Sequence, residues 1–105
     1  MILVLDGFNI IHKFPELADF MNAGDLVRAM NGLTSYMAEL RNIRPSFEIH
    51  IFYDGRRRRG DDTFRDFVSG IHLYYSLEET ADDLIEEYIE SRMGNHQIKV
   101  VTSDK

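Results

Sequence analysis

The chain begins with four consecutive apolar residues that lead directly into an acidic turn, Ile2-Leu-Val-Leu-Asp-Gly-Phe-Asn9. An apolar run of this kind is typical of a short strand buried on both faces, which belongs in the centre of a mostly parallel sheet. The strand ends at Asp6, where ligands of open α/β sheets bind, and Asn9 follows closely enough to share a site with it. Because Asp6-Gly7 is also an ordinary turn signal, the functional interpretation depends on how the other strands end.

Three more strands are predicted, and two of them also end in an aspartate. They cover residues 47–53, 71–75 and 98–102. Asp54 follows the first of these strands and Asp104 follows the last, so three of the four predicted strands end in a carboxylate. His50 and His72 lie inside strands among apolar residues, and we interpret both as packed or edge histidines rather than ligands.

Two helices are predicted between these strands from apolar residues at helical spacing. The first runs from Leu26 to about Asn42, with Asp25 as its N-cap. A single helical turn is expected earlier, at residues 8–12, and Pro15 limits how far it continues.

The second helix follows the third strand and carries acidic residues at its start. Ser76-Leu-Glu-Glu79 has the spacing of a capping box, Thr80 is an alternative cap one turn later, and Gly94-Asn95 closes the helix. At about 100° per residue, Asp82 borders the apolar stripe and can face the fold, whereas Asp83 lies nearly opposite and faces water. Glu79 lies three residues before Asp82 and shares its side. A favourable interaction with the helix dipole explains these acids equally well when they are taken alone.

Composition bounds the class of protein. A chain of 105 residues with 44% hydrophobic and 29% charged residues is typical of one globular domain, here spanning residues 1–105. It contains no cysteine and no apolar run of membrane-spanning or signal-peptide length, so thiolate metal sites are excluded and the cytoplasm is the expected compartment. The net charge of -6 argues against a general nucleic-acid coat protein, but it is compatible with a nuclease whose acids gather at a metal site.

The strand-ending acids predict a single site. If the strands are parallel, Asp6, Asp54 and Asp104 project from one edge of the sheet, and the helix that carries Asp82 begins there too. Their charges repel one another unless protons or cations compensate. Oxygen ligands select hard cations such as Mg²⁺ or Mn²⁺, which activate water and stabilise charge on a phosphodiester oxygen. Asn9 adds a neutral side chain that could orient a ligand or the scissile phosphate.

Four segments resemble, in order, the motifs of the YacP-like NYN-domain proteins of the PIN-like nuclease superfamily: Asp6-Gly-Phe-Asn9, Asp54-Gly55, Glu79-Thr-Ala-Asp82 and Thr102-Ser-Asp104. The resemblance implies a Mg²⁺- or Mn²⁺-dependent ribonuclease. It also implies a PIN-like, Rossmann-like three-layer α/β/α sandwich with a mostly parallel four-stranded sheet. By position, the implied catalytic residues are Asp6, Asn9, Asp54, Asp82 and Asp104, and the implied metal ligands are Asp6, Asp82, Asp104 and, more weakly, Glu79.

The chain departs from the family pattern at its end. Proteins of this group normally continue past the Thr-Ser-Asp motif with further helices and often a strand, whereas this sequence stops at Lys105. We therefore expect a C-terminally truncated form of the fold, with the last strand as an open edge and Asp104 prone to fraying.

Four consecutive arginines follow Asp54 in a segment without apolar residues, which is expected to be an exposed loop. They are Arg56, Arg57, Arg58 and Arg59, which we call the arginine run. A basic run is most often a solvated loop, but beside the acidic edge this one could bind the phosphates of an RNA substrate.

The sequence favours an RNA-cleaving enzyme over two alternatives. The first is a catalytically inactive PIN-like module that binds RNA or a protein partner. The second is a phosphate-handling α/β domain, which ranks lower because the second aspartate of the Asp-x-Asp pattern and a glycine-rich phosphate loop are both missing.

Overall fold

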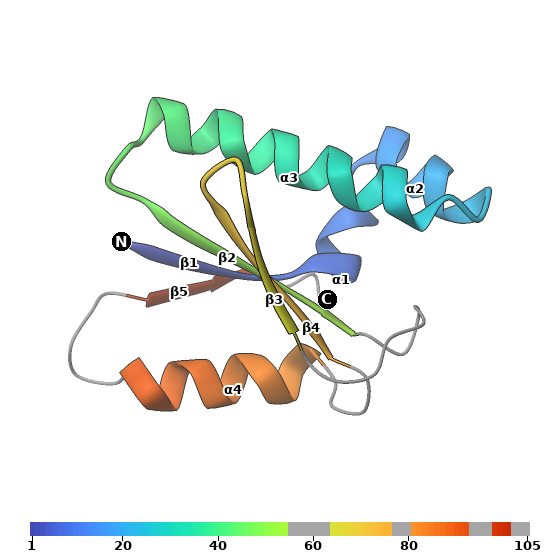
Figure 1. The fold of residues 1–105 in the computed structure, drawn as a ribbon. Coiled ribbons are helices and arrows are strands. Elements are labelled where there is room, and N and C mark those ends of the chain that lie inside the picture. The colour runs from blue at the N-terminus through green and yellow to red at the C-terminus, as the bar shows by residue number, and fades with distance from the viewer. Residues whose placement is uncertain (55–63, 77–80, 93–97, 102–105) are drawn as a thin grey trace.

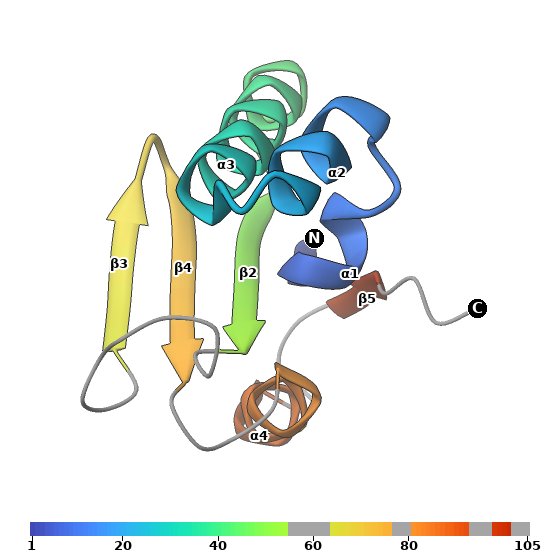
Figure 2. The same cartoon turned by 90° about the vertical axis from the view of Figure 1, so that its right-hand side faces the viewer.

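The computed structural model describes residues 1–54, 64–76, 81–92 and 98–101, which form an α/β fold around a five-stranded sheet. In chain order the elements are β1 (Ile2–Asp6), α1 (Gly7–Ile11), α2 (Pro15–Asn22), α3 (Leu26–Ile43), β2 (Glu48–Asp54), β3 (Phe64–Val68), β4 (Ile71–Ser76), α4 (Ala81–Arg92) and β5 (Ile98–Val101). Helices α1 to α3 cover one face of the sheet and α4 covers the other (Figures 1 and 2). The chain therefore has the three layers expected of a PIN-like α/β/α sandwich.

The four strands predicted from the sequence are all present and all parallel. The order in the sheet is β3-β4-β2-β1-β5. Strand β1 pairs in parallel with β2 and with β5, and β2 pairs in parallel with β4. Their carboxyl ends consequently lie along one edge, which we call the carboxyl edge. Asp6 and Asp54 are the last residues of β1 and β2 at this edge.

Strand β3 is a fifth strand that the sequence pattern does not predict. It pairs antiparallel with β4 in a hairpin whose turn, Ser69-Gly70, has positive φ angles of 54° and 83°. Residues 65–69 are all exposed, so the strand lacks the alternation of buried and exposed residues by which strands are recognised.

Helix α2 is a second element beyond the prediction, which treats Pro15 only as the end of the preceding turn. Pro15 instead begins the helix, where its fixed φ and missing N–H are tolerated. Helix α3 agrees with the prediction: it begins after Asp25, whose carboxylate accepts a hydrogen bond from the backbone N–H of Arg28 at 3.2 Å.

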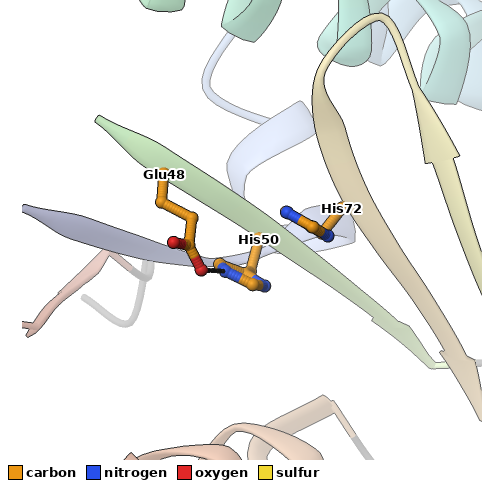
Figure 3. A group of neighbouring side chains, drawn as sticks. All are labelled: Glu48, His50 and His72. Atoms are coloured by element: carbon orange, nitrogen blue, oxygen red, sulfur yellow. Dashed lines mark hydrogen bonds and ion pairs between the residues drawn. The ribbon is translucent and has the colours of Figure 1, made fainter. Parts of the chain in front are cut away.

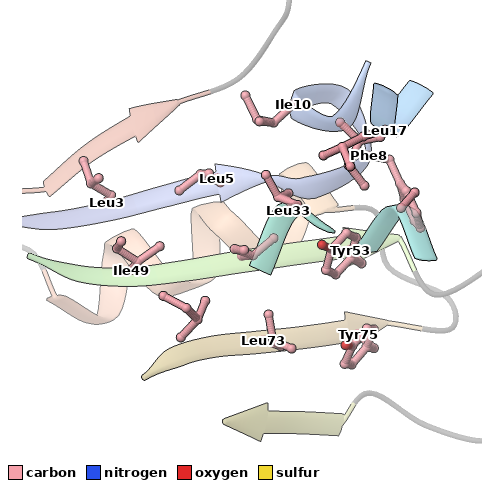
Figure 4. Packing of buried hydrophobic residues seen from close by; sticks show 14 residues of the cluster. Leu3, Leu5, Phe8, Ile10, Leu17, Leu33, Ile49, Tyr53, Leu73 and Tyr75 are labelled. Atoms are coloured by element: carbon pink, nitrogen blue, oxygen red, sulfur yellow. The ribbon is translucent and has the colours of Figure 1, made fainter. Parts of the chain in front are cut away.

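Strand β1 is buried on both faces, as its apolar run predicts. Leu3 and Leu5 belong to the core beneath α1 to α3, part of which Figure 4 shows. Ile2 and Val4 belong to a second core beneath α4. Burial of one such side chain contributes about 1.5–3 kcal/mol. The two cores therefore fix β1, and with it the position of Asp6, from both sides.

Candidate active site

Among the predicted site residues, Asp6 and Asn9 are the two whose side chains the structure describes. Asp6 is only 7% exposed, and Asn9 donates a hydrogen bond from Nδ2 to its Oδ2 at 2.7 Å. Asp6 precedes α1 with extended backbone angles, but its side chain makes no capping hydrogen bond to the helix. The alternative of Asp6 as the cap of its turn is therefore not supported. The buried carboxylate is positioned by a side-chain amide three residues further along the chain.

The start of α1 is held in place by close packing against β2. Gly7 lies on the ring of Tyr53, and a Cβ atom added to Gly7 would stand 2.3 Å from Cε1 of that ring. Phe8 contacts the same ring edge to face, with centroids 4.9 Å apart. Because α1 begins directly after Asp6, this packing sets the direction in which the chain leaves the carboxyl edge and brings Asn9 back to Asp6.

Asp54 lies at the same edge on the neighbouring strand. Asp6 pairs with Phe52 in the parallel register of β1 and β2, and Asp54 is two residues beyond Phe52. With a rise of about 3.3 Å per residue and about 4.8 Å between strands, the backbones of Asp6 and Asp54 are roughly 8 Å apart. The expected convergence of these two strand ends is therefore present in the backbone.

Helix α4 carries Asp82 as its second residue and follows β4 in the chain. Leu84 and Ile85 are buried against the sheet and Asp83 is exposed, as the helical spacing predicts. The orientation of the Asp82 side chain lies outside what the structure describes.

Several predicted site residues lie outside the described residues altogether. Two are the acidic residues Glu79 and Asp104. The others are the members of the arginine run, Arg56, Arg57, Arg58 and Arg59. The proposed roles of all six, in metal binding, catalysis or RNA binding, stay predictions from the sequence.

A second group of polar side chains lies away from the carboxyl edge, on the face of the sheet that α4 covers. Glu48, His50 and His72 each offer one possible metal ligand, and these atoms lie within 4.8 Å of one another. Figure 3 shows Glu48 and His50 on β2 and His72 on β4. Glu48 and His50 alternate along β2, and His72 is the register partner of His50. The sequence contains this alternation, but only the pairing of β2 with β4 brings His72 to it.

Hydrogen bonds already engage both ring nitrogens of His50, which is 1% exposed. Nε2 lies 2.6 Å from Oε2 of Glu48, and Nδ1 lies 2.6 Å from the hydroxyl of Tyr74. An ionised carboxylate can only accept, so Nε2 carries a proton. His50 is thus a packed and hydrogen-bonded histidine, as interpreted from the sequence.

The geometry of the two rings is poor for a shared metal ion. His50 and His72 are stacked with centroids 4.4 Å apart and planes only 9° from parallel. An imidazole binds a metal along a direction in its ring plane, so two parallel stacked rings cannot both point at one ion. One ring has to rotate before Glu48, His50 and His72 can coordinate together.

The three layers, the parallel strands and the two aspartates at the carboxyl edge, Asp6 and Asp54, define a PIN-like α/β domain. The family model for the YacP-like NYN domain matches residues 3–105, and the chain therefore belongs to this family. A crystal structure of a mutant of Rae1 (YacP) from Bacillus subtilis is similar, with a TM-score of 0.77 and 28% sequence identity. The match covers 99% of this chain and 58% of that chain, so this chain spans little more than half the length of that relative.

No curated protein matches the sequence. Among the described residues, no helix has both the length and the apolar character needed to cross a membrane.

Proposed function

We propose that the chain is a Mg²⁺- or Mn²⁺-dependent ribonuclease domain that cuts RNA phosphodiester bonds at the carboxyl edge. The observation that carries the proposal is the carboxylate of Asp6, which is buried at the end of the central strand and accepts a hydrogen bond from Asn9. Membership of the YacP-like NYN family and the similarity to Rae1 support a nuclease or RNA-related role.

The donors at this edge fit a hard cation. Asp6 offers carboxylate oxygen, the ligand type that Mg²⁺ and Mn²⁺ prefer, and Asn9 fixes its orientation as an outer partner of a metal ligand does. Asp82, Asp104 and, more weakly, Glu79 would be the other ligands. When bound, the ion would lower the pKa of a water molecule and stabilise the charge that develops on the phosphate.

The remaining residues would bind and orient the substrate. Asp54 belongs to the proposed catalytic set through its position at the end of β2, next to Asp6. The arginine run follows it closely in the sequence, and its four side chains would contact RNA phosphates. Asn9 would keep the Asp6 carboxylate aimed at the metal during the reaction.

The test is cleavage of a single-stranded RNA labelled at both ends, in Mn²⁺ and in chelator, by the unmodified protein, Asp6→Asn and Asp83→Asn. Asp83 is exposed on α4 and serves as the matched control. We expect the unmodified protein and Asp83→Asn to cut only in Mn²⁺. Asp6→Asn should lose more than about 100-fold in rate, since even outer partners of a metal site contribute about 10- to 100-fold.

Two results would contradict the proposal in different ways. Equal cleavage in Mn²⁺ and in chelator would remove the metal from the mechanism. Binding of RNA without cleavage would favour the alternative of an inactive RNA-binding module. A circular RNA of the same sequence separates cutting within the chain, which we propose, from trimming at its ends.

A further inference from the structure

A row of rings in contact crosses three strands on the face of the sheet that α4 covers. Phe67 on β3 contacts His72 on β4 with centroids 4.8 Å apart, and His72 stacks on His50 of β2. The row follows the register, because Phe67 pairs with His72 and His72 pairs with His50. Its inner member is buried, but its outer member, Phe67, is 61% exposed. The row therefore presents an aromatic ring to solvent.

A second row lies beside the first and nearer the carboxyl edge. Phe52 stacks on Tyr74 with centroids 4.2 Å apart and planes 5° from parallel. The guanidinium of Arg65 lies 5.5 Å from the centroid of the Tyr74 ring, and Arg65 is exposed. Arg65 and Phe67 are two residues apart on β3, so both outer members lie on the same face of the strand. We call these two exposed side chains the β3 platform.

The platform is left open by the helices and lies close to the candidate active site. Figure 2 shows β3 at the margin of the sheet, beyond α4 and α3. Arg65 pairs with Tyr74, and Asp54 pairs with Ser76, two residues further along β4. With about 3.3 Å per residue and about 4.8 Å per strand, the backbones of Arg65 and Asp54 are roughly 12 Å apart. One bound nucleic-acid strand could therefore contact both.

We propose that the β3 platform is a stacking site for unpaired bases of single-stranded RNA. The inference rests on the proposed function only in taking RNA as the ligand. An exposed aromatic ring beside a planar cation is the combination on which single-stranded nucleic acids stack, because every base has a flat π-face and the backbone is negatively charged. In a chain with a net charge of -6, such a local site supplies attraction that the whole molecule does not.

A protein partner added as a further strand is disfavoured by the backbone of β3. The side chain of Asp66 turns onto its own strand, and its Oδ1 accepts a hydrogen bond from the N–H of Phe67 at 2.8 Å. An added strand needs the donors of the edge to be available, and this donor is already engaged. The exposed side chains of the platform remain accessible to a base.

Fluorescence gives a direct test, because the sequence contains no tryptophan. Phe67→Trp places a single fluorophore on the platform, and Val27→Trp places one on α3, where Val27 is 68% exposed on the other side of the sheet. Both are titrated with a short single-stranded RNA in chelator, so that cleavage does not interfere. We expect saturable quenching of Phe67→Trp and none of Val27→Trp. A duplex of the same sequence should quench much less, because its bases are already stacked.

Affinity measured by anisotropy gives the second readout. One base on one aromatic ring predicts that Phe67→Ala weakens RNA binding about 5- to 150-fold. Val68→Ala is the matched control, since Val68 is the next residue, is 39% exposed and faces the other side of the strand. Arg65→Gln should reduce the slope of log affinity against log salt by about 0.7, whereas Arg65→Lys should keep the slope.

The outcomes separate this inference from the proposed function. If the unmodified protein binds RNA but Phe67→Trp is not quenched and Phe67→Ala binds normally, the platform is not a stacking site, while the nuclease proposal stands. If the platform stacks RNA that is never cut, the inference holds without catalysis. If no single-stranded RNA binds, both fail. A Phe67→Trp signal that changes with protein concentration alone would identify the platform as a contact between two copies of the chain, which overturns the inference.

Discussion

Gly7 and Tyr53 touch so closely that the residue after Asp6 and the residue before Asp54 are locked against each other. A Cβ atom at residue 7 would stand 2.3 Å from Cε1 of the Tyr53 ring, nearer than real Cβ atoms come to another heavy atom. The contact joins the first residue of α1 to the end of β2. The two strand ends that carry the proposed acids are therefore held together by packing in the core, and not only by the sheet.

Gly7→Ala should destabilise the fold by about 1–3 kcal/mol, because the rigid Tyr53 ring or α1 has to move. Gly32→Ala is the matched control. Its added Cβ would meet Cδ2 of Leu17 at 2.4 Å, but that atom is the end of a flexible side chain, and alanine favours the interior of α3 by up to about 1 kcal/mol. Denaturant melts should show a clearly larger loss in the free energy of unfolding for Gly7→Ala than for Gly32→Ala. Equal losses would mean that the Tyr53 ring or α1 can move to accept the added Cβ atom at little cost.

Tyr53→Phe should stabilise the protein. The hydroxyl of Tyr53 is buried and has no hydrogen-bond partner among the described residues. A buried hydroxyl without a partner costs about 1–3 kcal/mol, and phenylalanine keeps the ring on which Gly7 and Phe8 pack. A melt in which Tyr53→Phe is less stable than the unmodified protein would show that the hydroxyl has a bonding role.

The same substitution should alter stability at alkaline pH. Burial, and secondly repulsion from Tyr75, raises the pKa of Tyr53 above its ordinary value of 10.0. The unfolded state therefore loses this proton first, and the folded state loses stability as pH rises above about 10, by up to about 1.4 kcal/mol per pH unit. Tyr53→Phe lacks this contribution, so its advantage over the unmodified protein should widen between about pH 10 and pH 11. Parallel stability curves over this interval would contradict the assignment.

The sequence predicts a structural feature well when the residues that determine it lie close together in the chain. The central strand and the Asp6–Asn9 pair are local: one follows from an apolar run and the other from a spacing of three residues. Strand β3 escapes prediction because an exposed margin strand has no buried face to impose alternation. Helix α2 is not predicted because a proline can either end a helix or begin one, and Pro15 begins α2.

The features that sequence reasoning could not reach depend on register. His50 and His72 are far apart in the chain, and only the pairing of β2 with β4 stacks them and brings Glu48 to the same group. The two rows of contacting side chains that end in Arg65 and Phe67 likewise need the hairpin of β3 with β4. Strand pairing is fixed by the packing of the whole sheet, so no short sequence motif predicts that these side chains come together.

Replacing all four members of the arginine run, Arg56, Arg57, Arg58 and Arg59, by glutamine should weaken RNA binding in a salt-dependent way. Each phosphate contact adds about 0.7 to the slope of log affinity against log salt for a single strand, so the slope should fall by roughly two to three units if most of the four engage. A matched control replaces Arg28, which is exposed on α3 and pairs with Asp25. An unchanged slope in the quadruple variant would identify the run as a solvated loop.

Mn²⁺ should stabilise His72→Ala as much as it stabilises the unmodified protein. The parallel rings of His50 and His72 are not arranged to share an ion, so the functional metal is expected at the carboxyl edge instead. A ligand that binds only the folded state adds about 2.7 kcal/mol at a hundredfold excess over its Kd. Thermal melts in Mn²⁺ and in chelator measure this difference. If His72→Ala abolishes the stabilisation and Asp6→Asn does not, the metal belongs to the histidine group.

Asp6→Asn distinguishes a functional carboxylate from a structural one. The substitution keeps the shape and removes one negative charge, and an asparagine oxygen can still accept the hydrogen bond from Asn9. The side chain of Asp6 makes no capping hydrogen bond to α1, so the substitution removes no cap from this helix. Relief of repulsion from the other acids should leave the metal-free variant as stable as the unmodified protein, or more stable by about 1 kcal/mol, on the scale of one pKa unit.

Mn²⁺ supplies the second half of this test. In chelator, the midpoint denaturant concentration of Asp6→Asn should equal or exceed that of the unmodified protein. Mn²⁺ should stabilise Asp6→Asn much less than it stabilises the unmodified protein, and the variant should lose RNA cleavage. Asn9→Ala should act through Asp6: it leaves every proposed metal ligand in place but frees the carboxylate, so Mn²⁺ affinity should fall about 10- to 100-fold, as for other outer partners of a metal site. A variant Asp6→Asn that is destabilised in chelator yet stabilised by Mn²⁺ as fully as the unmodified protein would remove Asp6 from the metal site, because its carboxylate would then support the fold and not the ion.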